Sequence, residues 1–198
     1  MTRVELSDGE VDALIAQLWP HGDTLDGTQV HAVVDAARDP RIISLLDATG
    51  LERCCLFAGV LSPSLRAAAP HLVHLAPGVR FTRDFLRLGW GRSWGVLTIA
   101  PPDVTLQWLR KHLRTLLRVQ DEAGRTLMFR FYDPRVLRAY LPTCTSTEVQ
   151  AVFGPVHRFI CEADDNGGLQ AFDRDALQRP PHGVAPPMQA EPVLAEAS

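Results

Sequence analysis

The sequence has little lysine and no long apolar run, and these absences exclude several classes of protein. Lys111 is the single lysine beside nineteen arginines, which removes the usual Schiff-base and phosphate-binding chemistry of lysine. No stretch reaches the roughly 20 apolar residues that a transmembrane helix needs. The first residues are acidic and amphipathic, whereas a signal peptide is basic and then apolar. We therefore expect a cytoplasmic protein that does not bind membranes.

A basic excess and cysteine motifs are missing as well. The net charge is -3 and the pI is near 6.1, whereas non-specific nucleic-acid binders carry a basic stripe. The four cysteines, Cys54, Cys55, Cys144 and Cys161, show no CxxC spacing. We therefore expect reduced, structural thiols and no nucleic-acid partner.

Motifs for catalysis and cofactor binding are also absent. The chain contains no GxSxG, no GxxxxGK[ST] and no GxGxxG. Ser93 in "GRSWG" comes nearest to a nucleophile on a turn, and we interpret it as part of a glycine-rich connector. His71 and His74 would face opposite sides of a strand, which prevents shared metal coordination. We predict no cofactor and no metal site.

What is present is enough apolar sequence for one domain. The chain has 198 residues, of which 46% are hydrophobic. Helical and strand patterns alternate, which predicts an α/β fold: a single domain with a mixed β-sheet flanked by helices. We expect an N-terminal helix and linker over residues 1–28, the α/β domain over 29–174 and a disordered proline-rich tail over 175–198.

The individual elements follow from apolar spacing and from turn residues. We predict helices at about 8–18, 41–49, 81–89, 103–119, 134–141 and 145–153, the long one capped by Asp103 and the last one by Thr145 or Ser146 with Glu148. We predict strands at about 30–37, 53–58, 72–75, 94–100, 125–132, 156–163 and 169–172, with a tight turn at "DDNGG" between the last two.

The segment "FRFYDPR", Phe129 to Arg135, has the composition of a strand-to-helix junction. Pro134 suits the first turn of a helix, and Asp133 can cap that helix while its carboxylate pairs with Arg130 or Arg135. A contact site facing solvent is the alternative use of the same residues. His112 follows Trp108 by four residues on one flank of the long helix, so we expect it to pack on the indole and donate to a neighbour.

Six segments, taken in order, resemble a known family. They are "HAVVDAA", "LFAG…APHLVHL", "WGVLTIA", "LRKHLRTLLRV", "FRFYDPRVLRAYLP" and "FGPV". Together they look like the effector adaptors, or chaperones, of type VI secretion, a bacterial domain-of-unknown-function family often encoded between a spike protein and a toxin. The resemblance covers about Gln29 to Ala163.

The resemblance implies a protein that is not an enzyme. Such adaptors bind a secreted toxic effector in the cytoplasm and help to place it on a VgrG-type spike. The matching residues expected to define the fold are Asp35, Trp94, Gly95, His112, Leu113, Tyr132, Asp133, Pro134, Gly154 and Pro155. Three further matching residues, Arg114, Arg130 and Arg135, are expected to contact a partner, because arginine is favoured at interface hot spots.

Two other functions stay open at this point. A small hydrolase or transferase could use His112 with Asp133 or Ser93, and it would need a concave site with a perturbed pKa. An immunity protein that neutralises a secreted toxin would also be small and acidic.

Overall fold

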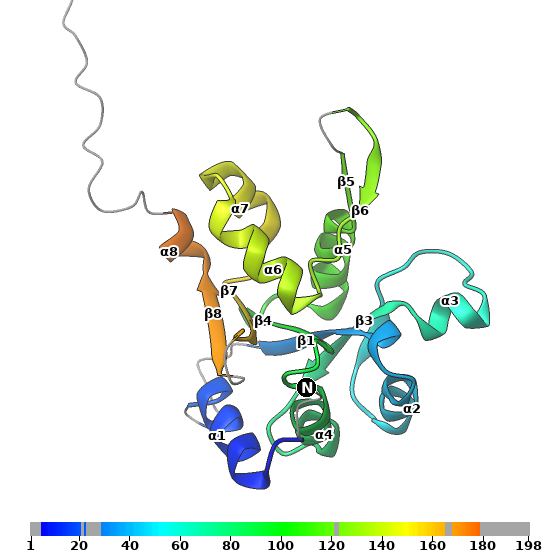
Figure 1. Ribbon diagram of the computed structural model, residues 1–198, viewed down its shortest axis with the longest axis vertical. Helices are drawn as coiled ribbons and strands as arrows, with labels where there is room; N and C mark the ends of the chain where they lie inside the picture. Colours follow the sequence, from blue (N-terminus) through cyan, green and yellow to red (C-terminus); the bar gives the residue numbers. More distant parts are fainter. Residues whose placement is uncertain (1–4, 21, 23–28, 121–122, 165–167, 179–198) are drawn as a thin grey trace, which may run out of the picture.

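The computed structural model describes residues 5–20, 22, 29–120, 123–164 and 168–178. A six-stranded sheet forms its centre (Figure 1), in the order β2-β3-β1-β4-β7-β8. Its strands are β1 (Gln29–Asp35), β2 (Arg53–Cys55), β3 (Pro70–Leu75), β4 (Gly95–Ala100), β7 (Arg158–Glu162) and β8 (Leu169–Asp173). The α/β class is thus confirmed. Every pair of neighbouring strands in the described sheet is antiparallel, however, so strand directions are not mixed.

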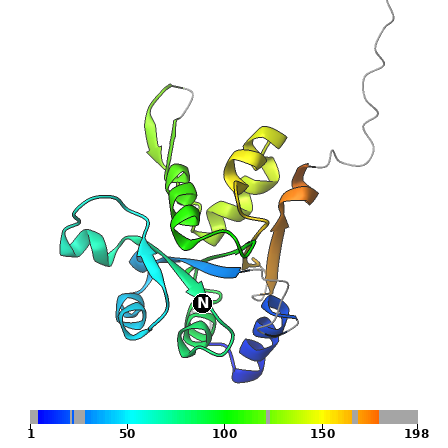
Figure 2. The same cartoon turned by 180° about the vertical axis from the view of Figure 1, so that it is seen from behind.

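Helices cover both faces of this sheet, as the two opposite views show (Figures 1 and 2). One layer contains α1 (Asp8–Leu18), α2 (Arg41–Ala48) and α4 (Arg80–Gly89), and the other contains α5 (Leu106–Leu116), α6 (Pro134–Tyr140) and α7 (Ser146–Phe153). The remaining elements are the short helices η2 (Ala36–Arg38), α3 (Pro63–Ala67), η3 (Leu141–Thr143) and α8 (Arg174–Gln178) and a hairpin of β5 (Arg118–Gln120) and β6 (Thr126–Met128).

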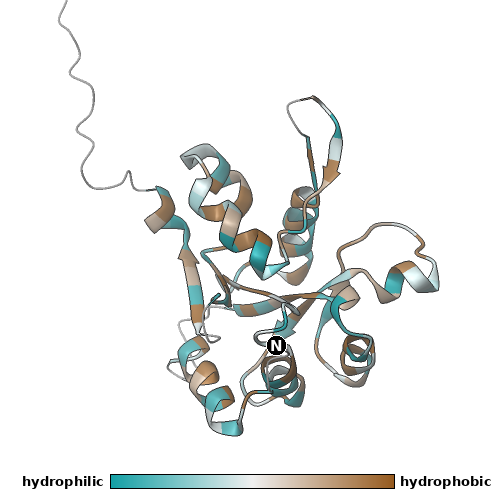
Figure 3. Cartoon of the chain, viewed as in Figure 1, coloured by the Kyte–Doolittle hydropathy of each residue, from teal (hydrophilic) through white to brown (hydrophobic). Residues whose placement is uncertain are grey.

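The central strand β1 explains why helices pack on both sides. Successive side chains of a strand point to opposite faces, and β1 places apolar side chains on both. Val30, Ala32 and Val34 join the core under α1, α2 and α4, whereas Val33 joins the core under α5, α6 and α7. Apolar residues accordingly colour the strands and the sheet-facing parts of the helices (Figure 3).

The predicted cap of α7 is confirmed, and the predicted cap of α5 is wrong. Capping boxes begin α1, with Ser7 and Glu10, and α7, with Thr145 and Glu148. Asp103 does not cap α5; the helix begins after Thr105, whose hydroxyl accepts from the amide of Trp108 at 3.2 Å. Val104 is buried between the two candidates.

The largest difference from prediction lies between α5 and α6. Helix α5 ends at Leu116 and β5 begins at Arg118, whereas the apolar spacing predicted a helix to residue 119. Strand β6 ends at Met128, and residues 129–133 form a loop instead of the second half of a strand. Phe131 is fully buried in the core of the domain. This burial draws the chain away from the exposed hairpin.

Both ends of the described chain also refine the prediction. Helix α1 packs on α4, with the Leu6 amide donating to the Arg87 carbonyl at 3.2 Å, so it belongs to the same core. Helix α8 occupies the first residues of the expected tail, and residues 179–198 lie outside the described residues. The middle of the "DDNGG" turn, residues 165–167, lies outside them as well. The predicted strand at 53–58 is reduced to the three-residue edge strand β2.

Candidate functional site

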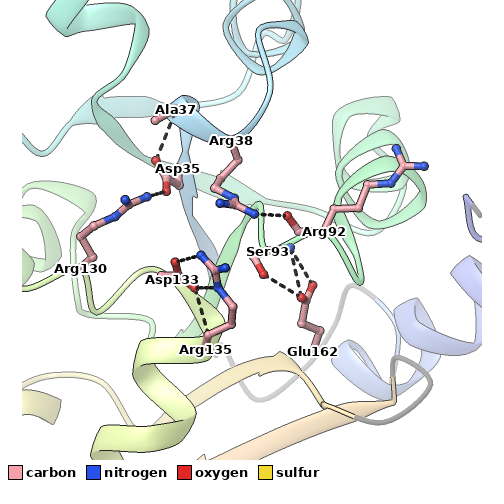
Figure 4. A network of polar contacts seen from close by, with 9 residues as sticks. All are labelled: Asp35, Ala37, Arg38, Arg92, Ser93, Arg130, Asp133, Arg135 and Glu162. Atoms are coloured by element: carbon pink, nitrogen blue, oxygen red, sulfur yellow. Dashed lines mark hydrogen bonds and ion pairs between the residues drawn. The ribbon is translucent and has the colours of Figure 1, made fainter. Parts of the chain in front are cut away.

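Three buried carboxylates surround the turn that precedes β4 (Figure 4). Asp35 ends β1, Asp133 precedes α6 and Glu162 ends β7. Their residues are 1%, 3% and 7% exposed. A carboxylate this deeply buried needs hydrogen-bonding or ionic partners, so the partners decide what this cluster can do.

Asp35 connects the sheet to the loop before α6. Its carboxylate accepts from the backbone amide of Ala37 at 3.2 Å and forms an ion pair with Arg130. Its own backbone amide donates to the Trp94 carbonyl at 2.7 Å. The Arg130 guanidinium also lies 5.8 Å from the ring centre of Tyr132. The pair joins residues 95 positions apart, and the local pattern that suggested an Asp133 partner for Arg130 missed it.

Replacing Arg130 with methionine is expected to lower the free energy of unfolding by about 3 kcal/mol, because it leaves the Asp35 carboxylate buried without its cation. Denaturant unfolding would measure the loss. The double variant Arg130→Met, Asp35→Asn is the control, since it removes the orphaned charge, and it should recover part of the stability. Equal losses in the single and double variants would contradict this role for the pair.

Asp133 caps α6, as the sequence predicted, and it pairs with Arg135. Its carboxylate accepts from the Arg135 backbone amide at 3.1 Å and from the guanidinium at 2.9 and 2.6 Å. Burial raises the pKa of Asp133, but the side-chain and backbone hydrogen bonds from Arg135 outweigh it and hold the pKa below its usual value. This carboxylate is therefore ionised and fully engaged at neutral pH.

Asp133→Ala is expected to destabilise the protein by about 1–2 kcal/mol through loss of the cap. Because the pKa of Asp133 is lowered by folding, its charge stabilises the protein above about pH 4 and ceases to do so as the pH falls through the folded pKa. Thermal melts at pH 7 and pH 3 would measure both effects. Asp133→Asn keeps a cap acceptor and should lose less; an unchanged melting temperature for Asp133→Ala would rule out the cap.

Glu162 holds the turn at Gly91 to Ser93. Its carboxylate accepts from the amides of Gly91 at 2.6 Å and Ser93 at 3.1 Å and from the Ser93 hydroxyl at 3.2 Å. Ser93 has a φ of 57°, an unusual value for a residue other than glycine. These three bonds hold the unusual backbone conformation. They also occupy the hydroxyl that the hydrolase hypothesis needed, and Ser93 is buried beside Glu162 with no histidine as partner among the described residues.

His112 lies elsewhere, between α5 and α7. Its Nε2 is 2.9 Å from the carbonyl oxygen of Val152, and Trp108, on which we expected it to pack, is half exposed. Burial lowers the pKa of His112, and the bond to Val152 offsets part of this lowering. A neutral imidazole bonded to a backbone carbonyl positions a helix. Among the described residues, His112 therefore forms no hydrogen bond with Asp133 or with Ser93.

The other motif residues lie at close contacts in the fold. A Cβ on Gly95 would be 2.2 Å from the carbonyl oxygen of Val33 on the neighbouring strand. Trp94 and Leu113 are buried in the two halves of the core, and Pro134 begins α6. Pro155 follows the end of α7 at Gly154.

The three arginines expected at an interface do not form one patch. Arg130 is half exposed but paired with Asp35, and Arg135 lies beside a shallow hollow of about 660 Å³ that Phe129 and Tyr140 also line. Arg114 lines a separate hollow of about 670 Å³ next to α5. Of the three, Arg114 alone has no carboxylate partner in the part of the chain that the structure describes.

The described residues contain no group of three or more His, Cys, Asp or Glu residues arranged to hold a metal. None of their helices has the length and apolar character to cross a bilayer. All four cysteines are free thiols, and burial raises the pKa of Cys54 and of Cys161 to about 11, so these two are protonated at neutral pH.

The segment that contains the Asp35–Arg130 and Asp133–Arg135 pairs matches a known family. Residues 30–151 match the family model described as "Domain of unknown function (DUF4123)". The chain belongs to the DUF4123 family. The match begins at β1, includes Asp35, Arg130 and Asp133, and ends within α7. No curated protein and no solved structure matched the chain at a significant level.

Proposed function

We propose that this DUF4123 protein is an adaptor of type VI secretion, which binds a toxic effector and helps to load it onto a VgrG-type spike. The resemblance of its six segments to such adaptors motivates the proposal, and the family match covers the same part of the chain. The partners would be the effector and the spike protein, met in the cytoplasm before secretion.

The main support for the proposal is the way in which the three buried carboxylates are bonded within the protein. Asp35, Asp133 and Glu162 each accept hydrogen bonds from the protein's own guanidinium or amide groups. A general acid or base must be able to reach a substrate proton. Asp133 lines the hollow of about 660 Å³ beside Arg135, but both of its oxygens are bonded to that arginine. The three carboxylates connect β1, α6, β7 and the turn before β4. Such a cluster supports a rigid platform for protein binding better than it supports catalysis.

Co-expression tests the proposal directly. The chain should co-elute in size-exclusion chromatography with the toxin encoded beside it, and it should raise the soluble yield of that toxin. An inactivated toxin protects the expression host. Absence of co-elution together with an unchanged soluble yield would refute the proposed function. A tagged protein of similar size and charge, expressed with the same toxin, is the matched control.

A further inference from the structure

The hollow beside Arg114 has the composition of a protein-binding groove. It lies between the segment that leads into α3, the second half of α5 and the β5–β6 hairpin, which project on the same side of the molecule (Figures 1 and 2). We call it the α5 groove. Its volume is about 670 Å³, and it is lined by Leu56, Phe57, Ala58, Leu61, Leu65, Lys111, Arg114, Thr115, Leu117, Arg118 and Met128.

Exposed apolar side chains gather around the α5 groove. Of the large hydrophobic residues that are exposed in the described part of the chain, Val60, Leu65 and Met128 lie on the loop, the short helix α3 and the hairpin strand that border the groove. Val119 and Leu127 pair on the opposite face of the hairpin, and Trp108 lies in the first turn of α5. Leu65 and Met128 line the groove itself. Exposed apolar patches with a polar rim mark interaction sites on soluble proteins. Water is a poor solvent for this surface, and a partner's apolar side chains would cover it.

The rim of the α5 groove is positively charged. Lys111, Arg114 and Arg118 line it, its lining contains no carboxylate, and none of the three forms an ion pair with a described residue. An adjoining hollow of about 430 Å³ shares Phe57 and Leu61 with it. That hollow adds Arg53, Arg66 and Arg110; Asp47 is its one acidic residue and pairs with Arg53 at 2.7 Å. This concentration of positive charge stands out in a chain whose net charge is -3.

The hairpin that forms one wall lacks support of its own. All six residues of β5 and β6 are exposed, and these strands pair with each other rather than with the main sheet. Two-stranded hairpins without further packing are marginally stable in water. The amide of Phe129 donates to the Leu117 carbonyl at 3.0 Å and anchors its base. A ligand in the α5 groove would therefore contact the hairpin and stabilise it.

We infer that the α5 groove binds an acidic segment of the effector that carries bulky apolar side chains, and this inference rests on the proposed adaptor function. Apolar side chains of the segment fill the floor between Phe57, Leu65 and Met128, and its carboxylates face Lys111, Arg114 and Arg118. Complementary charge steers such a complex and fixes its register. A nucleic acid would satisfy the cations but leave the apolar floor exposed to water, so the observations favour a protein.

Charge reversal on the rim tests the inference. The probe is the inactivated toxin encoded beside the gene, and titration calorimetry measures its Kd for the full chain. Arg114→Glu is expected to weaken binding about tenfold or more, and binding by the wild type should weaken as salt rises from about 0.1 to about 0.5 M. Arg80→Glu is the matched control, because Arg80 is highly exposed on α4 in the other helix layer; its Kd should match the wild type.

The outcomes separate this inference from the proposed function. If the wild type binds the toxin and Arg114→Glu binds it equally well, the α5 groove is not the docking site, although the adaptor function stands. If the wild type does not bind, both fail. If a single-stranded oligonucleotide binds and Arg114→Glu abolishes that binding, the groove recognises nucleic acid and the inference is wrong.

Hydrogen exchange gives a second readout that needs no variant. Amides at 56–65, 118–120 and 126–128 should exchange more slowly in the complex with the toxin than in the free chain, because the ligand covers the groove and orders the hairpin. Amides of α4 should be unaffected. Unchanged exchange at the hairpin and at 56–65 in a formed complex would overturn the inference.

Discussion

Gly154→Ala is expected to destabilise the protein by about 3 kcal/mol, which corresponds to a fall of roughly 6–12 °C in melting temperature. Gly154 ends α7 with a φ of +49°, and an added Cβ would lie 2.3 Å from the ring of His112. A φ of +49° with a ψ of -115° is sparsely populated by alanine and costs about 1–3 kcal/mol, and overpacking a well-filled site costs about 1–3 kcal/mol more. Denaturant unfolding of the full chain measures the sum.

Two controls separate these contributions. Gly59 has a φ of +80° with nothing within 4 Å of its added Cβ, so Gly59→Ala reports the backbone cost alone, about 1 kcal/mol. The double variant Gly154→Ala, His112→Ala removes the ring that the new methyl group meets. Its loss should be smaller than the sum of the two single losses. If Gly154→Ala lowers the free energy of unfolding no more than Gly59→Ala does, the contact with His112 is not tight.

The stability of the protein is expected to fall steeply as the pH drops below 6.5, because of His31. This residue is buried in the middle of β1, its ring centre lies 5.1 Å from that of His74, and its Nδ1 has no hydrogen-bond partner among the described residues. Burial and the nearby His74 lower the pKa of His31 to about 3. Between pH 3 and 6.5 the unfolded chain therefore binds a proton that the folded chain does not.

Stability rises with pH wherever the unfolded state binds more protons, by about 1.4 kcal/mol per pH unit for one group. Acidification from about pH 6.5 to pH 5 should thus lower the free energy of unfolding by about 2 kcal/mol through His31. His31→Val should flatten this part of the profile. Burial also lowers the pKa values of His71 and His112, so a smaller slope of the same sign should remain. A profile that is unchanged by His31→Val would contradict the assignment.

Local patterns were enough to predict most elements of this fold. The capping box of α7, the proline at the start of α6 and the apolar run in β1 each depend on residues close together in the chain. The predictions failed where tertiary packing decides. Apolar spacing continued α5 into Arg118 and Val119, but these residues form the exposed hairpin, because the chain must return to bury Phe131.

The candidate site was predictable only in part for the same reason. The Asp133 cap and its Arg135 pair join residues two apart and follow from the sequence. The Asp35–Arg130 pair and the hold of Glu162 on Ser93 join residues 95 and 69 apart, and no periodicity signals them. Glu162 directly follows the apolar residues Phe159 to Cys161 of β7, and this is the one local signal of its burial. The α5 groove is formed by three segments that are separate in the sequence, so local patterns could not predict it.

Deleting the gene in its host tests the adaptor function most directly. We expect that the toxin is no longer delivered to competitor cells, that the producing cells grow normally, and that the wild-type gene on a plasmid restores delivery. Comparison with a strain that lacks only the toxin gene shows how much delivery is lost. Producing cells poisoned by their own toxin would identify an immunity protein, and undiminished delivery would contradict the adaptor function.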